Sequence, residues 1–415
     1  MPHLEQTPLL SVIVPVYRGA AYLEACAASV LSQQLPDGGV LELLLIDDGS
    51  TDGSAAVCDA LAARDARVRV WHRPNAGVCA ARNAGMEKAR GEYLTFADED
   101  DTVAPGSYFA ALDRAREIDA DAVLFSIRYV TRTGTAQETP PLFAAQTPAQ
   151  LAPYFLQMAI GCSLWGAAWN KLYRTAVLRA GGVRFPQGAP VNEDELFVFA
   201  VLRAARRWAS VPEAVYLYNQ CNAGSVTARG RENLVACAQE NLPAFLEAMR
   251  AAGLGALCGV YAQKRIGVAA QNQFSAYLSS YTTFPRAQRR RGLRALLAEK
   301  AHREAVLAQL STQKDAASRL LYALVRLRAC GVLAALPVWK AKLRGTPVSE
   351  SVPAAVQNTA ASEQAGAAAQ TAAALPNAPA AVPAAANPEN VPAAAQNENT
   401  ASAQNSAQGE KEEHR

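Results

Sequence analysis

Four consecutive acidic residues, Asp98, Glu99, Asp100 and Asp101, follow the apolar stretch "YLTF". Side chains alternate along an extended chain, so Asp98 and Asp100 can point to the same side. Two such carboxylates bind a hard divalent cation, which can also hold a diphosphate. A run of acids is otherwise often a solvated turn. Because these acids end an apolar strand, we predict a Mg²⁺ or Mn²⁺ site.

Two further polar clusters come directly after apolar runs. In "LLLIDDGSTDGS", Asp47 and Asp48 follow a run that a sheet would bury. Carboxylates there either form a turn and helix cap or accept hydrogen bonds from a base or ribose hydroxyl. In "NAGVCAARNAG", Arg82 lies at the start of a predicted helix, whose N-terminal dipole favours anions. A plain surface arginine is the alternative reading of Arg82.

The elements that would position these clusters alternate along the first 130 residues. Ala-rich segments with helical periodicity separate the apolar runs "LLSVIVPVY", "VLELLLID", "RVRVWH", "YLTFAD" and "DAVLFSIRY". This order predicts a mostly parallel, doubly wound α/β sheet flanked by helices. Ligands of such sheets bind outside the carboxyl ends of the strands, where these polar clusters fall.

The helices of this region also carry sequence signals. The first would bury one stripe, formed by Leu23, Cys26, Val30 and Leu31. Either Ser50 or Asp52 would cap the second helix. Both signals place helices between the strands, as the doubly wound arrangement requires.

Composition divides the 415 residues into parts. Half of the chain is apolar, enough for a substantial core, but from about residue 345 it becomes Ala, Pro, Gln, Asn, Ser and Thr. We therefore expect a catalytic domain over residues 1–228, a basic helical extension over 229–345 and a disordered tail over 346–415. From Glu350 onward the tail carries seven Glu against Lys411 and Arg415, a net charge of −5. Since the formal net charge of the whole chain is +3, the rest of the chain carries about +8.

This basic excess could serve nucleic acid, anionic lipid, a phosphorylated substrate or solubility alone. Residues 286–344 combine many arginines with apolar helical stripes such as Leu320, Leu324 and Leu327. These helices either contact an anionic membrane or pack on the catalytic domain with their basic side chains in solvent. We expect no nucleic-acid partner.

Two further signals bear on location. The N-terminus lacks a signal-peptide pattern, and no window reaches the roughly 18 apolar residues of a membrane span. The eight cysteines are scattered without metal-ligand spacing, which favours reduced thiols and disfavours zinc. We expect a cytoplasmic protein, with a peripheral position at the inner face of the cell membrane as a further option.

Taken together, the motifs of residues 9 to 227 resemble the bacterial family 2 glycosyltransferases of cell-surface polysaccharide synthesis. The segments "SVIVPVYRGAAYLEACAASVLSQQ", "LLIDDGSTDGS", "NAGVCAARNAGMEKARGEYLTFADEDD" and "FPQGAPVNEDELF" carry the resemblance. It implies an A-type glycosyltransferase fold, here followed by a helical C-terminal region and the disordered tail. Glu99 departs from the family pattern, whose middle position is more often small or neutral.

The resemblance also implies roles for individual residues. Pro15, Tyr17, Asp48 and Asp47 would hold the nucleoside, usually uridine. Arg82 would lie near the nucleotide, Asp98 and Asp100 would frame the metal and diphosphate, and Asp101 would support the sugar. Asp194 of "NEDELF" would be the base. The three acids of this segment would also suit a plain helix N-terminus. In "YLYNQCNAGSVT", Asn219 and Gln220 occupy a region where members often carry arginines.

The chemistry implied is a metal-dependent transfer that inverts the anomeric centre. No Ser-His-Asp or Cys-His arrangement is apparent, since His72 and His302 lie outside the strand-end clusters, so we expect direct displacement. The acceptor would be a hydroxyl of a glycan or a lipid-linked glycan. The alternatives are an inactive nucleotide-sugar-binding protein and a nucleotidyltransferase, although "PVYRGAAY" lacks the Gly-rich basic loop of the latter.

Overall fold

The computed structural model describes residues 7–131, 134–160, 164–187, 192–222, 233–278, 284–313 and 315–336. The tail predicted over 346–415 lies outside the described residues, as does "AGSVT" at 223–227. The three parts predicted from composition stay a prediction.

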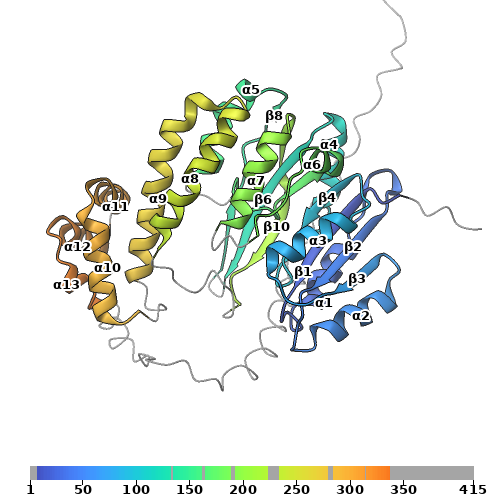
Figure 1. The fold of residues 1–415 in the computed structure, drawn as a ribbon, viewed down its shortest axis with the longest axis horizontal. Helices are drawn as coiled ribbons and strands as arrows, with labels where there is room; N and C mark the ends of the chain where they lie inside the picture. Colours follow the sequence, from blue (N-terminus) through green and yellow to red (C-terminus); the bar gives the residue numbers. More distant parts are fainter. Residues whose placement is uncertain are drawn as a thin grey trace, which may run out of the picture. The chain divides into compact units, whose positions relative to one another are not determined.

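One ten-stranded mixed sheet forms the centre of the fold (Figure 1). Eight strands pair in the order β3, β2, β1, β4, β9, β6, β10 and β5. Their bounds are β1 Leu10–Val16, β2 Leu41–Asp47, β3 Val68–His72, β4 Tyr93–Phe96, β5 Thr102–Val103, β6 Ala122–Thr131, β9 Lys171–Arg174 and β10 Trp208–Asn219. β7 (Gly134–Glu138) pairs with β6, and β8 (Ala144–Ala145) pairs with β10.

The predicted doubly wound sheet is confirmed for β1 to β4. β1 runs parallel to β2 and to β4, with Leu10 opposite Leu41 on one side and Tyr93 on the other. Every residue of β1 and β2 is buried, as expected of parallel strands covered on both faces. The short strand β9 then runs antiparallel between β4 and β6, an insertion that the alternating pattern did not indicate.

Helices follow the strands as the pattern predicts. They are α1 (Leu23–Leu31), α2 (Ser54–Arg64), α3 (Val78–Lys88), α4 (Ser107–Glu117), α5 (Pro148–Ala159), α6 (Thr175–Ala180) and α7 (Glu193–Ala204). α1 buries Leu23, Cys26 and Val30, whereas Leu31 is only half-buried. α3 lies tightly on β1 because Gly85 has no side chain; a Cβ there would stand 2.3 Å from Cγ2 of Ile13.

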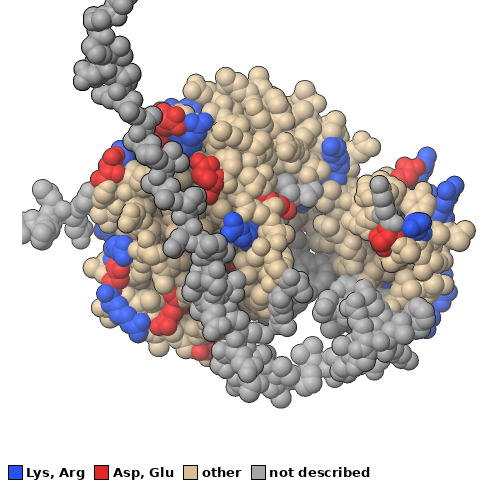
Figure 2. Space-filling view, turned by 180° about the vertical axis from the view of Figure 1, so that it is seen from behind, with Lys and Arg blue, Asp and Glu red and all other residues tan. Residues whose placement is uncertain are grey.

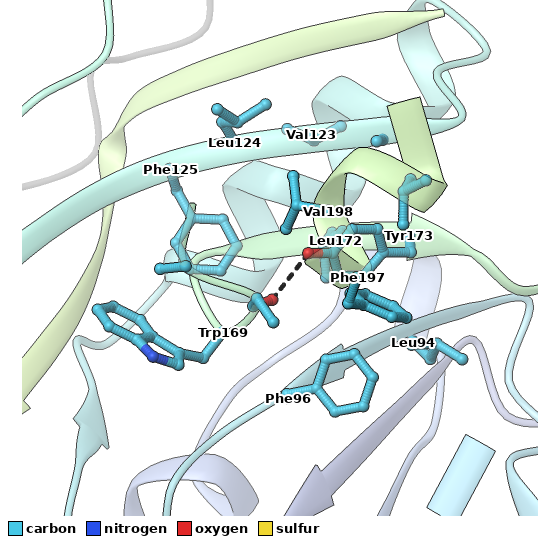
Figure 3. Packing of buried hydrophobic residues seen from close by; sticks show 14 of the residues in the cluster. Leu94, Phe96, Val123, Leu124, Phe125, Trp169, Leu172, Tyr173, Phe197 and Val198 are labelled. Carbon is cyan, nitrogen blue, oxygen red and sulfur yellow. Dashed lines mark hydrogen bonds between the residues drawn. The ribbon is translucent and has the colours of Figure 1, made fainter. Parts of the chain in front are cut away.

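Aromatic packing holds the start of α7 against the sheet (Figure 3). The Phe197 ring of α7 lies 5.5 Å from the rings of Phe96 in β4 and Tyr173 in β9, centroid to centroid. It also stacks on Phe185 at 4.0 Å. The Tyr173 hydroxyl donates a 2.9 Å hydrogen bond to the Ala168 carbonyl. This packing places the first turn of α7, with its acids, next to β4.

Six more helices follow the sheet. They are α8 (Leu234–Ala251), α9 (Cys258–Leu278), α10 (Arg286–Ala298), α11 (Lys300–Thr312), α12 (Ala316–Arg326) and α13 (Cys330–Leu333). Phe245 of α8 and Tyr261 of α9 belong to the same buried cluster as the sheet. Phe274, later in α9, belongs to a second cluster with residues of α10 to α13. Within the described part of the chain, no helix is long and apolar enough to cross a bilayer.

Candidate active site

A buried arginine joins two of the predicted site carboxylates. Arg82 of α3 is 3% exposed. Its Nη1 donates to Oδ1 of Asp194 at the start of α7, and its Nη2 donates to Oδ1 of Asp98 after β4 at 2.7 Å. Three segments that are distant in sequence therefore meet at one guanidinium. Arg82 is thus no plain surface arginine, the alternative that its sequence context left open.

The electrostatics of this group follow from its burial. Burial raises the pKa of Asp194 to about 6, although the positive charge of Arg82 opposes the rise. Burial alone would lower the pKa of Arg82, but Asp194 and Asp98 outweigh it and raise that pKa further. Arg82 therefore stays charged, while Asp194 changes protonation close to neutral pH. Within the described residues, Arg82 Nε has no hydrogen-bond partner.

The last acid of "DEDD", Asp101, is buried and hydrogen-bonded to residues of β10. Asp101 is 1% exposed, and its carboxylate accepts hydrogen bonds from the Tyr216 hydroxyl at 2.8 Å and the Asn219 amide at 2.7 Å. Tyr216 in turn accepts a bond from the backbone amide of Asp98 at 2.9 Å. Asp101 thereby connects the acidic turn to β10. Its predicted role in sugar binding stays a prediction, and this arrangement leaves the carboxylate almost no free surface.

Asp100 and Glu99 lie closer to the surface of the turn. Asp100 accepts a 2.8 Å hydrogen bond from the Asn222 side chain, and burial together with Asp98 raises its pKa. Burial, Asp100 and Asp98 raise the pKa of Glu99 to about 8. Glu99 leans on the loop after β1, where a Cβ on Gly19 would stand 2.3 Å from its Cγ. The larger middle residue is thus accommodated by a glycine opposite.

A divalent cation fits this turn only with help from a substrate. Within the described ranges, no group of three or more His, Cys, Asp or Glu side chains could hold a metal ion. Asp98 and Asp100 offer carboxylate oxygens to a cation. Burial and the negative charge of Asp98 raise the pKa of Asp100, so the two carboxylates repel each other, and a bound cation would relieve that repulsion. Mg²⁺ commonly takes one or two carboxylates and completes its shell with phosphate oxygens and water. The residues present fit that mode of binding.

The predicted nucleoside carboxylates hold the surrounding loops. Asp48 accepts hydrogen bonds from the backbone amides of Ala76 at 3.1 Å and Gly77 at 2.7 Å, just before α3. Asp47 accepts bonds from the Ser50 amide at 3.0 Å and from His72 Nδ1 at 2.8 Å. The expectation that His72 lies outside the strand-end clusters is therefore wrong, because the last residue of β3 lies next to the end of β2. Burial would raise the pKa of Asp47, but the bonds from His72 and Ser50 lower it.

The loop after β1 is positioned by residues that the sequence analysis did not assign to the site. The amides of Arg18, Gly19 and Ala20 donate to the side chains of Ser50, Ser54 and Asp52, at 3.1, 3.0 and 3.3 Å. Asp52 also accepts from the Ser54 amide at 3.2 Å, so of the two predicted caps it is the one that bonds the start of α2. The motif "DGSTDGS" is the part of the sequence that could have indicated these contacts, because it contains Ser50, Asp52 and Ser54.

These bonds bear on Pro15 and Tyr17. Pro15 is buried within β1. Tyr17 directly follows the last residue of β1 and is 43% exposed. The Tyr17 amide donates a long 3.5 Å bond to Glu99. The predicted nucleoside and metal turns are therefore neighbours.

Behind Asp194, a second ion pair fixes α7. Glu195 is 8% exposed and accepts hydrogen bonds from Arg265 Nη2 and, at 3.1 Å, from the Tyr261 hydroxyl. Both donors lie on α9. The sequence does not indicate this contact, because nothing in "NEDELF" points to a partner some 70 residues away.

Comparison with known proteins identifies the class that this fold and site define. Residues 11–167 match the profile of glycosyl transferase family 2. The chain is 31% identical over 238 residues to the uncharacterized glycosyltransferase YibD of Escherichia coli (strain K12), covering 56% of this chain and 67% of YibD. It is also 31% identical over 223 residues to the uncharacterized glycosyltransferase EpsJ of Bacillus subtilis (strain 168), covering 53% of this chain and 63% of EpsJ.

The structural comparison agrees in fold. Staphylococcus aureus TarS 1–349, solved in complex with UDP-GlcNAc, matches with a TM-score of 0.53 and 20% identity, covering 81% of this chain and 92% of that one. The chain therefore belongs to the bacterial family 2 glycosyltransferases and has their A-type fold. It spans less than two thirds of the length of EpsJ. The roles of the individual site residues stay predictions.

Proposed function

We propose that this chain transfers a sugar from a nucleotide-diphosphate donor, with UDP as the expected nucleotide, to a hydroxyl of a glycan or lipid-linked acceptor. The transfer inverts the anomeric centre and serves cell-surface polysaccharide synthesis. One observation carries the proposal: Arg82 joins Asp194, the proposed base, to Asp98 of the acidic turn. The UDP-GlcNAc bound to TarS supports a nucleotide-sugar donor.

Asp194 takes the proton of the acceptor hydroxyl. As that oxygen forms its bond to the anomeric carbon, the bond from this carbon to the diphosphate oxygen breaks on the opposite face, and the electron pair leaves with the nucleotide. Asp194 then carries the proton and Arg82 keeps its pairing with Asp98. A pKa of about 6 suits this step, since the carboxylate is ionised at neutral pH yet still accepts a proton readily.

Asp100 and Asp98 would hold Mg²⁺ or Mn²⁺ together with the diphosphate of the donor. Such an ion supplies charge neutralisation for the leaving nucleotide. The ends of β1 and β2 and the turns after them, with Pro15, Tyr17, Asp47 and Asp48, form the nucleoside side. Asp48 acts there by holding the amides of Ala76 and Gly77 in place.

A nucleotide-release assay with the full chain tests the proposal. It uses a panel of UDP-sugars and other nucleotide sugars, with candidate lipid-linked glycans present. The expected result is release from one donor that depends on the acceptor and stops in excess chelator, because Asp98 and Asp100 alone supply too few ligands. Asp100→Asn should lose most of this turnover. Undiminished turnover in chelator would remove the metal role. Binding of a donor without turnover with any acceptor would indicate a nucleotide-sugar-binding protein instead.

The proposal places the enzyme at the inner face of the cell membrane, where a lipid-linked acceptor would be presented. The basic helices after the sheet support this placement, since their exposed arginines would face anionic lipid.

A further inference from the structure

Three arginines line a hollow in the C-terminal helices. The hollow has a volume of about 380 Å³, and its lining includes Arg290 and Arg294 of α10 together with Arg328 and Cys330. All three arginines are exposed. Among the described residues, none of these three side chains has a hydrogen-bond or ion-pair partner, whereas the exposed side chain of Arg64 pairs with a carboxylate.

The three arginines share this lining with the buried Cys330. Burial raises the pKa of the Cys330 thiol, and the positive charges of Arg294, Arg290 and Arg328 each oppose that rise. Three guanidinium groups line this one hollow and no carboxylate of the described residues does, so the lining favours a bound anion. Guanidinium groups bind phosphate oxygens through paired hydrogen bonds.

Exposed apolar side chains flank the lining residues in the sequence: Leu327 precedes Arg328, Val332 follows Gly331, and Leu320 lies earlier on α12, and these three are called the apolar rim below. Leu320, Leu327 and Val332 are 56%, 77% and 52% exposed. Eight large hydrophobic side chains are exposed among the described residues, and these three fall within thirteen positions. Leu320 and Leu327 are seven residues apart and share one face of α12 and its end. Single exposed aliphatic side chains need no explanation, but three within the segment that also supplies Arg328 to the cationic hollow favour a contact surface.

The surrounding helices are strongly basic. The described residues from 284 to 336 contain nine Arg and Lys300 against Glu299, Glu304 and Asp315. In Figure 2, the part of the surface formed by α10 to α13 shows several Lys and Arg side chains along its outer edge and few acidic ones. Positive charge and exposed aliphatic side chains on the same group of helices match a bilayer that carries anionic headgroups.

We propose that this hollow binds the phosphate of an anionic phospholipid headgroup at a bilayer surface. Arg290, Arg294 and Arg328 hold the phosphate, while Leu320, Leu327 and Val332 enter the interfacial layer. A free phosphate would leave the apolar rim without a function. The inference specifies the membrane contact of the proposed function, but it does not depend on which sugar is transferred.

Sedimentation of the full chain with vesicles, without donor or acceptor, tests the proposal. Binding should be strong to vesicles that mix phosphatidylglycerol with phosphatidylcholine and absent from phosphatidylcholine alone. The triple variant Arg290→Gln, Arg294→Gln, Arg328→Gln should bind on the order of 100-fold more weakly, from about fivefold for each arginine. The matched control Arg64→Gln, Arg67→Gln, Arg116→Gln changes the net charge equally and should bind within about threefold of wild type.

A second variant tests the apolar rim. Leu327→Ser with Val332→Ser should bind at low salt and lose most binding at high salt, where headgroup attraction is screened. Thermal unfolding of each variant checks that the helices stay folded. Equal loss in both triple variants would overturn the site, because net charge alone would then explain the binding. Saturable binding of inorganic phosphate without vesicle binding would also overturn it and would assign the hollow to a free anion. Nucleotide release measured without vesicles separates either result from a failure of the proposed function.

Discussion

At the scale of residues, Arg82 makes the two proposed carboxylate sites dependent on each other. Asp194→Asn keeps the side-chain shape and removes the proton acceptor, so kcat should fall by roughly 10² to 10⁴ while donor affinity changes little. The same change removes one ion pair from the buried Arg82, so some loss of stability should accompany it. Steady-state kinetics and calorimetric donor binding measure the two effects separately.

Glu193→Gln is the matched control, since Glu193 precedes Asp194 on the first turn of α7 and acts on Arg82 and Asp194 through its charge. It should retain turnover. If Glu193→Gln were inactive and Asp194→Asn active, the base would be Glu193, and activity of both would reduce "NEDELF" to a helix start.

The raised pKa of Asp194 predicts an acidic limit to turnover. With a pKa of about 6 instead of the ordinary 3.8, Asp194 becomes protonated below about pH 6, and kcat should fall about tenfold for each further pH unit. The sign for stability is opposite: the folded state binds this proton more tightly, so the contribution of Asp194 to stability declines as the pH rises from about 4 to 6. A pH profile of kcat measures the limit, and the residual turnover of Asp194→Asn should lack it. A flat profile between pH 5 and 8 would contradict the assignment.

At the scale of elements, α9 holds the helix that carries the proposed base. The pair Glu195–Arg265 connects α9 to the first turn of α7, and both side chains are largely buried. Arg265→Met should therefore destabilise the fold by about 3 kcal/mol, because it leaves the Glu195 carboxylate buried without its charged partner. It should also lower kcat by displacing Asp194. Chemical denaturation and kinetics give the two readings.

Lys264→Met is the control for this change, since Lys264 is an exposed neighbour on the same helix and loses the same charge. It should change stability by less than about 0.5 kcal/mol. The double variant Glu195→Gln with Arg265→Met should recover part of the loss, because no unpaired charge then stays buried. A double variant worse than the sum of its parts would contradict this account.

At the scale of the whole molecule, the described residues form two buried clusters, and α8 and α9 contribute to both. Residues of α10 to α13 cover Phe274 and Tyr277, whereas the composition after residue 345 supplies no core. A chain that ends at residue 345 should therefore retain wild-type turnover. A chain that ends at residue 283 should expose the second cluster and lose soluble yield. Expression, light scattering and turnover of the two truncations distinguish these outcomes, and loss of most turnover in the longer one would give the tail a catalytic part.

The strands β1 to β4, the helices between them and the positions of the polar clusters could be predicted from the sequence, because periodicity and turn residues are local properties. The sequence also indicated the family, since several specific motifs occur in one order. The pairing of Arg82 with Asp98 and Asp194 was decided by the tertiary structure, because these residues meet only once α3, β4 and α7 pack together. The same holds for Asp101, which local sequence cannot distinguish from Asp100. Only the fold places one of these neighbouring acids beneath Tyr216 and leaves the other at the surface of the turn.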